Sequence, residues 1–212
     1  RLLSNFAPQL CINYISLLLD ILEEESKSES SDFYFKCTPF QNEEEIIPDN
    51  GILDIMSNKI TPFVFPIQYF ILLNPLAILP QLLQGLKEKQ KELLANLDCM
   101  TDINNQEAHL ALFIQIATVV ILIKSSGSSN NDPKIKYHSD FFAQILSLLH
   151  LSENWAVNGV TLPCLEMSLI LFISQFKNTL FGPSSSRTQL SQNLYKQLKL
   201  KRVVSSFEDC QS

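Results

Sequence analysis

Glycine and charged side chains are scarce in this sequence. Its 212 residues include only 5 glycines, whereas about 7% is usual. Charged residues make up 18%, against the usual ~25%. So few glycines leave little scope for two-residue hairpins or for loops that wrap a phosphate with backbone amides. The low share of charge indicates extra surface that a binding partner covers.

Sequence signatures of common enzymes are also missing, including the nucleotide-binding, zinc-protease and hydrolase motifs. The histidines are His109, His138 and His150, and none lies at zinc-binding spacing from a cysteine pair. His138 precedes Ser139 and Asp140, which we interpret as a helix cap, because the sequence fixes no nucleophile beside them. We predict no catalytic residue, no metal ligand and no bound cofactor, and a protein that is not an enzyme.

Neither the cysteines nor the apolar segments indicate secretion or a membrane span. Five cysteines are odd in number and scattered, which predicts reduced thiols in an intracellular protein. The longest apolar run, Leu110 to Ile123, falls short of the ~20 residues that cross a bilayer and predicts a buried helix. The sequence begins with Arg1 instead of methionine, and an amphipathic helix follows instead of a signal-peptide pattern, so we expect a fragment of a longer protein. We favour the nucleus slightly over the cytoplasm.

Hydrophobic residues recur every three or four positions through most of the chain, which predicts an all-α fold. Several of the predicted helices begin at a proline, and Pro80 is expected to restart one of them. The predicted helices span residues 6–24, 51–60, a bent or late-starting segment within 63–73, 75–97, 104–124, 139–151, 163–181 and a last segment after 186.

The helix predicted at 104–124 is apolar nearly all round, so we expect the other helices to surround it. We interpret Asn104 to Glu107 as a capping box in which Glu107 satisfies amides at the start of its own helix. Paired helices begun by prolines resemble armadillo and HEAT arrays. Because no exact repeat period is present, we predict an irregular multi-helix array. It is either a fragment of an armadillo/HEAT-like α-solenoid or a compact helical domain, which fits nearly as well.

We predict one helical domain over residues 1–182. It would contain an acidic, aromatic-containing loop at 25–50 and a flexible loop at 125–136. Residues 183–212 would form a linker, an amphipathic basic helix and a tail. Residues 1–60 hold 4 basic and 11 acidic side chains, so a partner at that end is expected to be basic.

The first functional hypothesis is a non-catalytic helical scaffold or adaptor that binds protein partners within a larger hetero-complex. One alternative is a ligand-binding module or enzyme with a pocket between helices. Another is a nucleic-acid-associated subunit that contacts phosphate through the basic helix. Aromatic side chains dominate binding hot spots, and basic side chains bind acidic partners. The candidate partner-binding residues are Phe33, Tyr34, Phe35, Phe40, Phe63, Phe65, Tyr69, Phe70, Trp155, Lys196, Lys199, Lys201 and Arg202.

Overall fold

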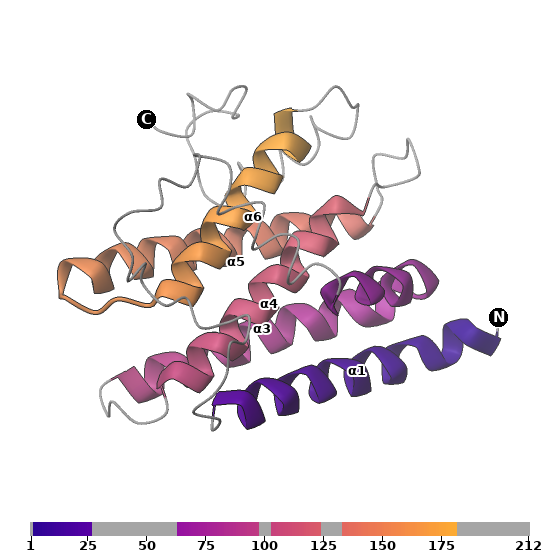
Figure 1. The fold of residues 1–212 in the computed structure, drawn as a ribbon. Helices are drawn as coiled ribbons and strands as arrows, with labels where there is room; N and C mark the ends of the chain where they lie inside the picture. The colour runs from indigo at the N-terminus through magenta and orange to yellow at the C-terminus, as the bar shows by residue number, and fades with distance from the viewer. Residues whose placement is uncertain (1, 27–62, 98–102, 124–132, 182–212) are drawn as a thin grey trace, which may run out of the picture.

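Helices form every regular element in the part of the chain that the structure describes, which confirms the predicted all-α fold (Figure 1). The structure is a computed structural model, and it describes residues 2–26, 63–97, 103–123 and 133–181. The helices are α1 (Leu2–Ser26), an unlabelled helix (Phe63–Leu73), α3 (Pro75–Leu97), α4 (Ile103–Leu122), α5 (Pro133–Val157) and α6 (Pro163–Phe181).

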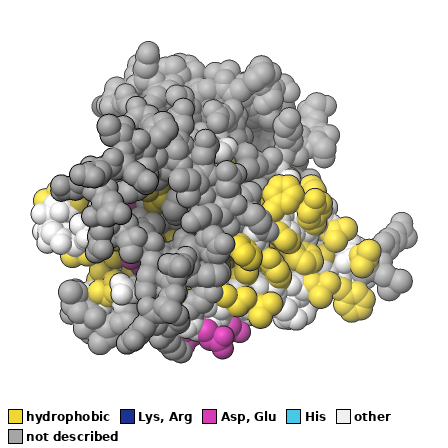
Figure 2. Space-filling view, in the orientation of Figure 1, with side chains coloured by type: hydrophobic (Ala, Val, Ile, Leu, Met, Phe, Trp, Pro, Cys, Tyr) yellow, Lys and Arg dark blue, Asp and Glu magenta, His cyan; other side chains and the backbone are white. Residues whose placement is uncertain are grey.

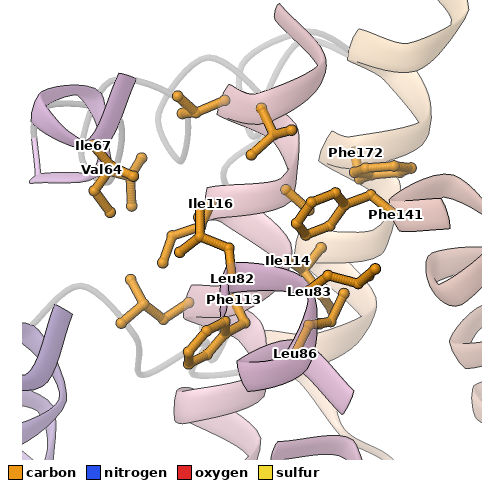
Figure 3. Packing of buried hydrophobic residues seen from close by; sticks show 14 of the residues in the cluster. Val64, Ile67, Leu82, Leu83, Leu86, Phe113, Ile114, Ile116, Phe141 and Phe172 are labelled. Carbon is orange, nitrogen blue, oxygen red and sulfur yellow. The ribbon is translucent and has the colours of Figure 1, made fainter. Parts of the chain in front are cut away.

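Helix α4 is the central element, as its uniform apolarity predicted. It contacts α1, α3, α5 and α6, and every side chain from Leu110 to Ile121 is buried. Figure 3 shows Ile116 of α4 between Ile67 on one side and Phe172 of α6 on the other. A fully buried side chain of this size stabilises a fold by about 1.5–3 kcal/mol. The core therefore extends outward from α4.

Helix α1 and the helix Phe63–Leu73 pack side by side in opposite directions. The Tyr14 hydroxyl donates a hydrogen bond to the Phe63 carbonyl at 2.8 Å, and the Tyr14 and Phe70 rings lie 6.3 Å apart. The side-chain Nδ2 of Asn74 donates a hydrogen bond to the Ser4 carbonyl at 3.0 Å. Because residue 4 meets residue 74 while residue 14 meets residue 63, the two helices are antiparallel.

Helix α3 begins at its predicted cap but has no restart. The Asn74 side chain accepts a hydrogen bond from the Ala77 amide at 3.3 Å, at the start of the helix. The predicted restart at Pro80 is wrong, because α3 continues past it to Leu97. Ile78 and Leu82, on either side of Pro80, are buried, so packing offsets the backbone hydrogen bond that proline lacks.

Helix α5 begins earlier than expected. It starts at Pro133, which places Ser139 and Asp140 inside the helix, so their interpretation as a cap is wrong. Proline is favoured in the first turn because its missing amide hydrogen would be unbonded there anyway. Ser139 and His138 are buried. Of the predicted loop at 125–136, residues 133–136 form the first turn of α5, and residues 125–132 lie outside the described residues.

A short connection joins α5 to α6 where the sequence predicted a break. Gly159 has φ of 78°, a left-handed conformation that glycine adopts without strain. The Val160 amide then donates to the Trp155 carbonyl at 2.9 Å and closes the end of α5. Residues 25 and 26 of the predicted acidic loop at 25–50 belong to α1, so the loop begins later than expected. The rest of that loop, the predicted helix at 51–60 and the predicted linker and basic helix at 183–212 lie outside the described residues.

Candidate protein-interaction surface

Some predicted partner-binding aromatics are exposed and others pack inward. Phe63, Phe65 and Tyr69 are exposed, whereas Phe70 and Trp155 are half-buried against the core. The structure thus places three exposed candidates on the helix Phe63–Leu73, with Phe65 and Tyr69 on one side of it, and places Trp155 near the end of α5. The remaining candidates lie outside the described residues: Phe33, Tyr34, Phe35, Phe40, Lys196, Lys199, Lys201 and Arg202.

A row of exposed apolar side chains on α1 was not among the predicted site residues. Its members recur at intervals of three, four or seven residues and include Leu3 and Phe6, with 69% and 61% of their surface exposed. The complete row is Leu3, Phe6, Leu10, Leu17 and Ile21. A different face of α1 enters the core through Ala7, Cys11, Ile15, Leu18 and Leu22. One feature of the sequence could have predicted this row: α1 contains more apolar residues than a single buried face needs.

The exposed rows of α1 and the neighbouring helix lie on the same side of the molecule. In Figure 2, hydrophobic side chains gather where Figure 1 shows α1 and the helix Phe63–Leu73. We call this surface the apolar face. Its members are Leu3, Phe6, Leu10, Leu17, Ile21, Phe65, Tyr69, Leu72 and Leu76. Large exposed apolar patches on a protein commonly mark interaction sites.

The charge on the apolar face is of one sign. Neither Leu2–Ser26 nor Phe63–Leu73 contains a lysine or arginine. Asp20 and Glu24 are exposed near the end of α1, where the helix dipole is also negative. Acidic atoms lie beside the hydrophobic patch in Figure 2. The surface therefore combines an apolar stripe with an acidic end.

Glu107 joins two helices by hydrogen bonds. Its Oε1 atom accepts bonds from the Cys164 amide at 2.6 Å and the Leu165 amide at 3.1 Å, in the first turn of α6. Burial raises the pKa of the Glu107 carboxyl, and these two amides oppose that effect. The predicted capping box is therefore wrong, because Glu107 caps α6 across space instead of its own helix. Its role is structural.

His109 lies between α1 and α3. Burial and the nearby Lys89 ammonium lower its pKa, whereas the Leu19 carbonyl and the carboxylates of Glu23 and Glu92 act in the opposite direction. Its Nε2 atom is buried and has no hydrogen-bond partner in the described part of the chain. The surroundings favour a neutral imidazole.

Among the described residues, the other titratable side chains form no metal site. Within the described ranges, no group of three or more histidine, cysteine or acidic side chains is placed to hold a metal ion. Burial raises the pKa of the Cys11 thiol to about 12. A thiol with so high a pKa forms almost no thiolate at neutral pH and is a poor nucleophile. Cys11 therefore serves as a small core side chain.

Among the described helices, one segment could cross a membrane on length and composition alone. This segment, Leu3–Glu24, has 22 residues and lies within α1. Core helices of soluble proteins and signal sequences pass the same test, so the evidence for a span is weak. Here α1 also packs against α3 and α4. No clear membrane span is therefore found among the described helices.

A comparison with protein families gives a match for most of the helical body. The family described as "Exportin-7-like, TPR domain" matches residues 72–205. This range contains α3 to α6, whereas α1 and most of the helix Phe63–Leu73 precede it. No curated protein and no solved structure matches the chain. Because the family match covers more than half of the sequence, the protein belongs to the Exportin-7-like, TPR domain family.

Proposed function

We propose that this protein is a non-catalytic helical scaffold that binds protein partners within a hetero-complex of nucleocytoplasmic transport. The family provides a helical-repeat fold suited to protein interaction, and its name links it to export. Helical-repeat domains bind through extended surfaces formed by stacked helices. The protein would act in the nucleus and in the cytoplasm, where transport complexes form and dissociate.

The apolar face is the observation that carries this proposal. Leu3 and Phe6 leave most of their surface in water, and Tyr69 is 60% exposed. Covering such side chains removes apolar area from water, which stabilises a complex by about 25 cal/mol per Å² before the costs of association. Phe65 and Tyr69 would be aromatic contacts in that interface, and the exposed Phe63 would be an additional contact at the start of the same helix.

The sequence-predicted sites outside the described residues remain part of the proposal as additional contacts. The aromatic side chains of Phe33, Tyr34, Phe35 and Phe40 would contribute at the acidic end of the chain. The cations Lys196, Lys199, Lys201 and Arg202 would bind an acidic surface.

The test is affinity capture with the whole 212-residue chain from nuclear and cytoplasmic extracts, with quantification of each retained protein relative to the chain. We expect one or a few proteins in near-stoichiometric amounts. A matched pair of variants checks the surface: Leu10→Asn alters the apolar face, and Ile170→Asn alters an equally exposed position on α6. Capture of no stoichiometric protein by the unaltered chain would contradict the proposed function.

A further inference from the structure

We propose that the apolar face binds an amphipathic helix of a partner protein, and that this helix carries lysine or arginine where it meets Asp20 and Glu24. The inference rests on the proposed function and specifies the chemistry of the partner. It follows from the spacing of the exposed residues and from the charge at one end of α1.

The shape of the surface fits a helix. The exposed row on α1 runs from Leu3 to Ile21, 18 residues and about 27 Å at 1.5 Å per residue. A second exposed row on the antiparallel neighbour includes Phe65, Tyr69 and Leu72. Two adjacent helices with apolar rows can accept a third helix that presents apolar side chains every three or four residues.

The charge of the surface selects a basic partner. Asp20 and Glu24 are exposed, and their carboxylates are one turn apart, near the negative end of the α1 dipole. Neither α1 nor the helix Phe63–Leu73 contains a cation that could neutralise them. Lysine or arginine on the incoming helix would supply the missing positive charge and fix the direction in which the helix lies.

Two other occupants fit this surface less well. A second copy of the chain would present the same face, which contains no cation for Asp20 and Glu24. An anionic lipid surface attracts helices with a basic polar face, and this face carries acidic residues only. Both occupants give distinct results in the experiment below.

The probe is a fluorescent 18-residue synthetic helix with leucine at intervals of three and four, lysine in both end turns and glutamine elsewhere. A matched peptide has glutamate in place of lysine. In fluorescence anisotropy, we expect the whole chain to bind the lysine peptide about 10-fold more tightly than the glutamate peptide. A few exposed ion pairs together supply the free energy that corresponds to this ratio of dissociation constants. The paired change Asp20→Lys with Glu24→Lys should reverse the order of the two peptides.

Matched substitutions test the apolar contacts. The double variant Leu10→Asn with Tyr69→Asn should weaken lysine-peptide binding by about 10-fold or more. Ile170→Asn should change it by less than about 2-fold, because Ile170 is 51% exposed, close to the 48% of Leu10, but lies on α6. Circular dichroism of each variant verifies that the helices are retained.

Four results would overturn the inference. They are no binding of the lysine peptide, equal binding of the two peptides, a dimer of the chain in light scattering that Leu10→Asn dissociates, and binding to anionic vesicles in place of the peptide. Each of these is separable from the proposed function. If affinity capture still yields a stoichiometric protein that the double variant retains, the protein is a scaffold that uses another surface.

Discussion

At the scale of single residues, the buried Glu107 carboxylate connects two helices. The carboxylate is buried, yet two amides of α6 direct their hydrogens at one of its oxygens. Buried polar groups cost free energy unless they are hydrogen-bonded. Glu107 and the start of α6 therefore depend on each other.

Replacing Glu107 tests this dependence. Glu107→Ala leaves the Cys164 and Leu165 amides without their acceptor, so we expect a loss of about 1–3 kcal/mol in the free energy of unfolding. Glu107→Gln keeps an acceptor oxygen and should cost less than the alanine change. Urea unfolding of both variants gives the comparison, and a negligible loss in Glu107→Ala would contradict the dependence.

The imidazole of His109, whose buried Nε2 atom has no hydrogen-bond partner among the described residues, predicts a pH-dependent stability. Because the folded state lowers the pKa of His109, the unfolded state binds a proton more readily. Stability is therefore retained above the unfolded pKa of about 6.5 and falls as the pH decreases from there toward the lower folded pKa. Melting temperatures between pH 8 and pH 5 measure the effect.

The matched control is His109→Gln, which cannot be protonated in this range. We expect the variant to lose the part of the pH dependence that follows the imidazole, while Lys89, Glu23 and Glu92 remain in place around it. An unchanged dependence in His109→Gln would assign the effect to another group.

At the scale of the elements, the packing of α3 on α4 depends on a glycine. A Cβ atom on Gly85 would lie 2.5 Å from Cε1 of Phe113, far inside normal contact distance. Phe113 is itself buried, so its ring has little space into which to move. Gly85 therefore permits the close approach of these two helices.

Gly85→Ala consequently should destabilise the protein by about 1–3 kcal/mol, although alanine in a helix normally gains up to about 1 kcal/mol over glycine. Denaturant titration measures this difference. Adding Phe113→Leu should recover part of the loss, because the smaller side chain leaves room for the methyl group. A stabilising effect of Gly85→Ala alone would contradict the close packing.

Hydrophobic periodicity predicted the elements well where one helix buries one clear face. Leu165, Leu169 and Phe172 recur at helical spacing and are all buried in α6, and α5 ends at Val157, two residues before Gly159. Local capping patterns were less informative. The sequence around Ser139 resembles a cap, but Pro133 begins the helix and neighbouring helices bury Ser139.

The candidate surface was only partly predictable. Tyr69 was expected from its aromatic character, whereas the exposed Leu10 and Leu17 were missed. Periodicity places these leucines on the same helix as the buried Leu18, and it cannot distinguish a core face from an exposed apolar face. That distinction depends on which helices pack against α1, and the spacing of residues within α1 does not contain it.

At the scale of the whole molecule, one connected core joins all the described helices. Leu169 of α6 lies within this core, and Lys89 lies at a partly exposed edge of α3, where its ammonium is 2.7 Å from a Glu92 carboxylate oxygen. A mutation inside the core leaves a cavity that the surrounding helices fill incompletely, whereas a mutation at the surface leaves water in place of the side chain.

We therefore expect Leu169→Ala to lower the free energy of unfolding by about 2–5 kcal/mol. Lys89→Ala removes one partly exposed ion pair and should cost less than about 1 kcal/mol. Chemical denaturation of the two variants measures both values. Similar small losses at both positions would contradict the position of α6 in the core.

The proposed function is that this helical protein acts by binding other proteins. The most direct test is the solution mass, by light scattering, of the 24.1 kDa chain purified from a cell extract with whatever binds it. The account predicts a single species heavier than the chain, with a stoichiometric protein partner that Leu10→Asn with Tyr69→Asn releases and Ile170→Asn retains. A monomer of 24.1 kDa that carries no protein through purification would contradict it.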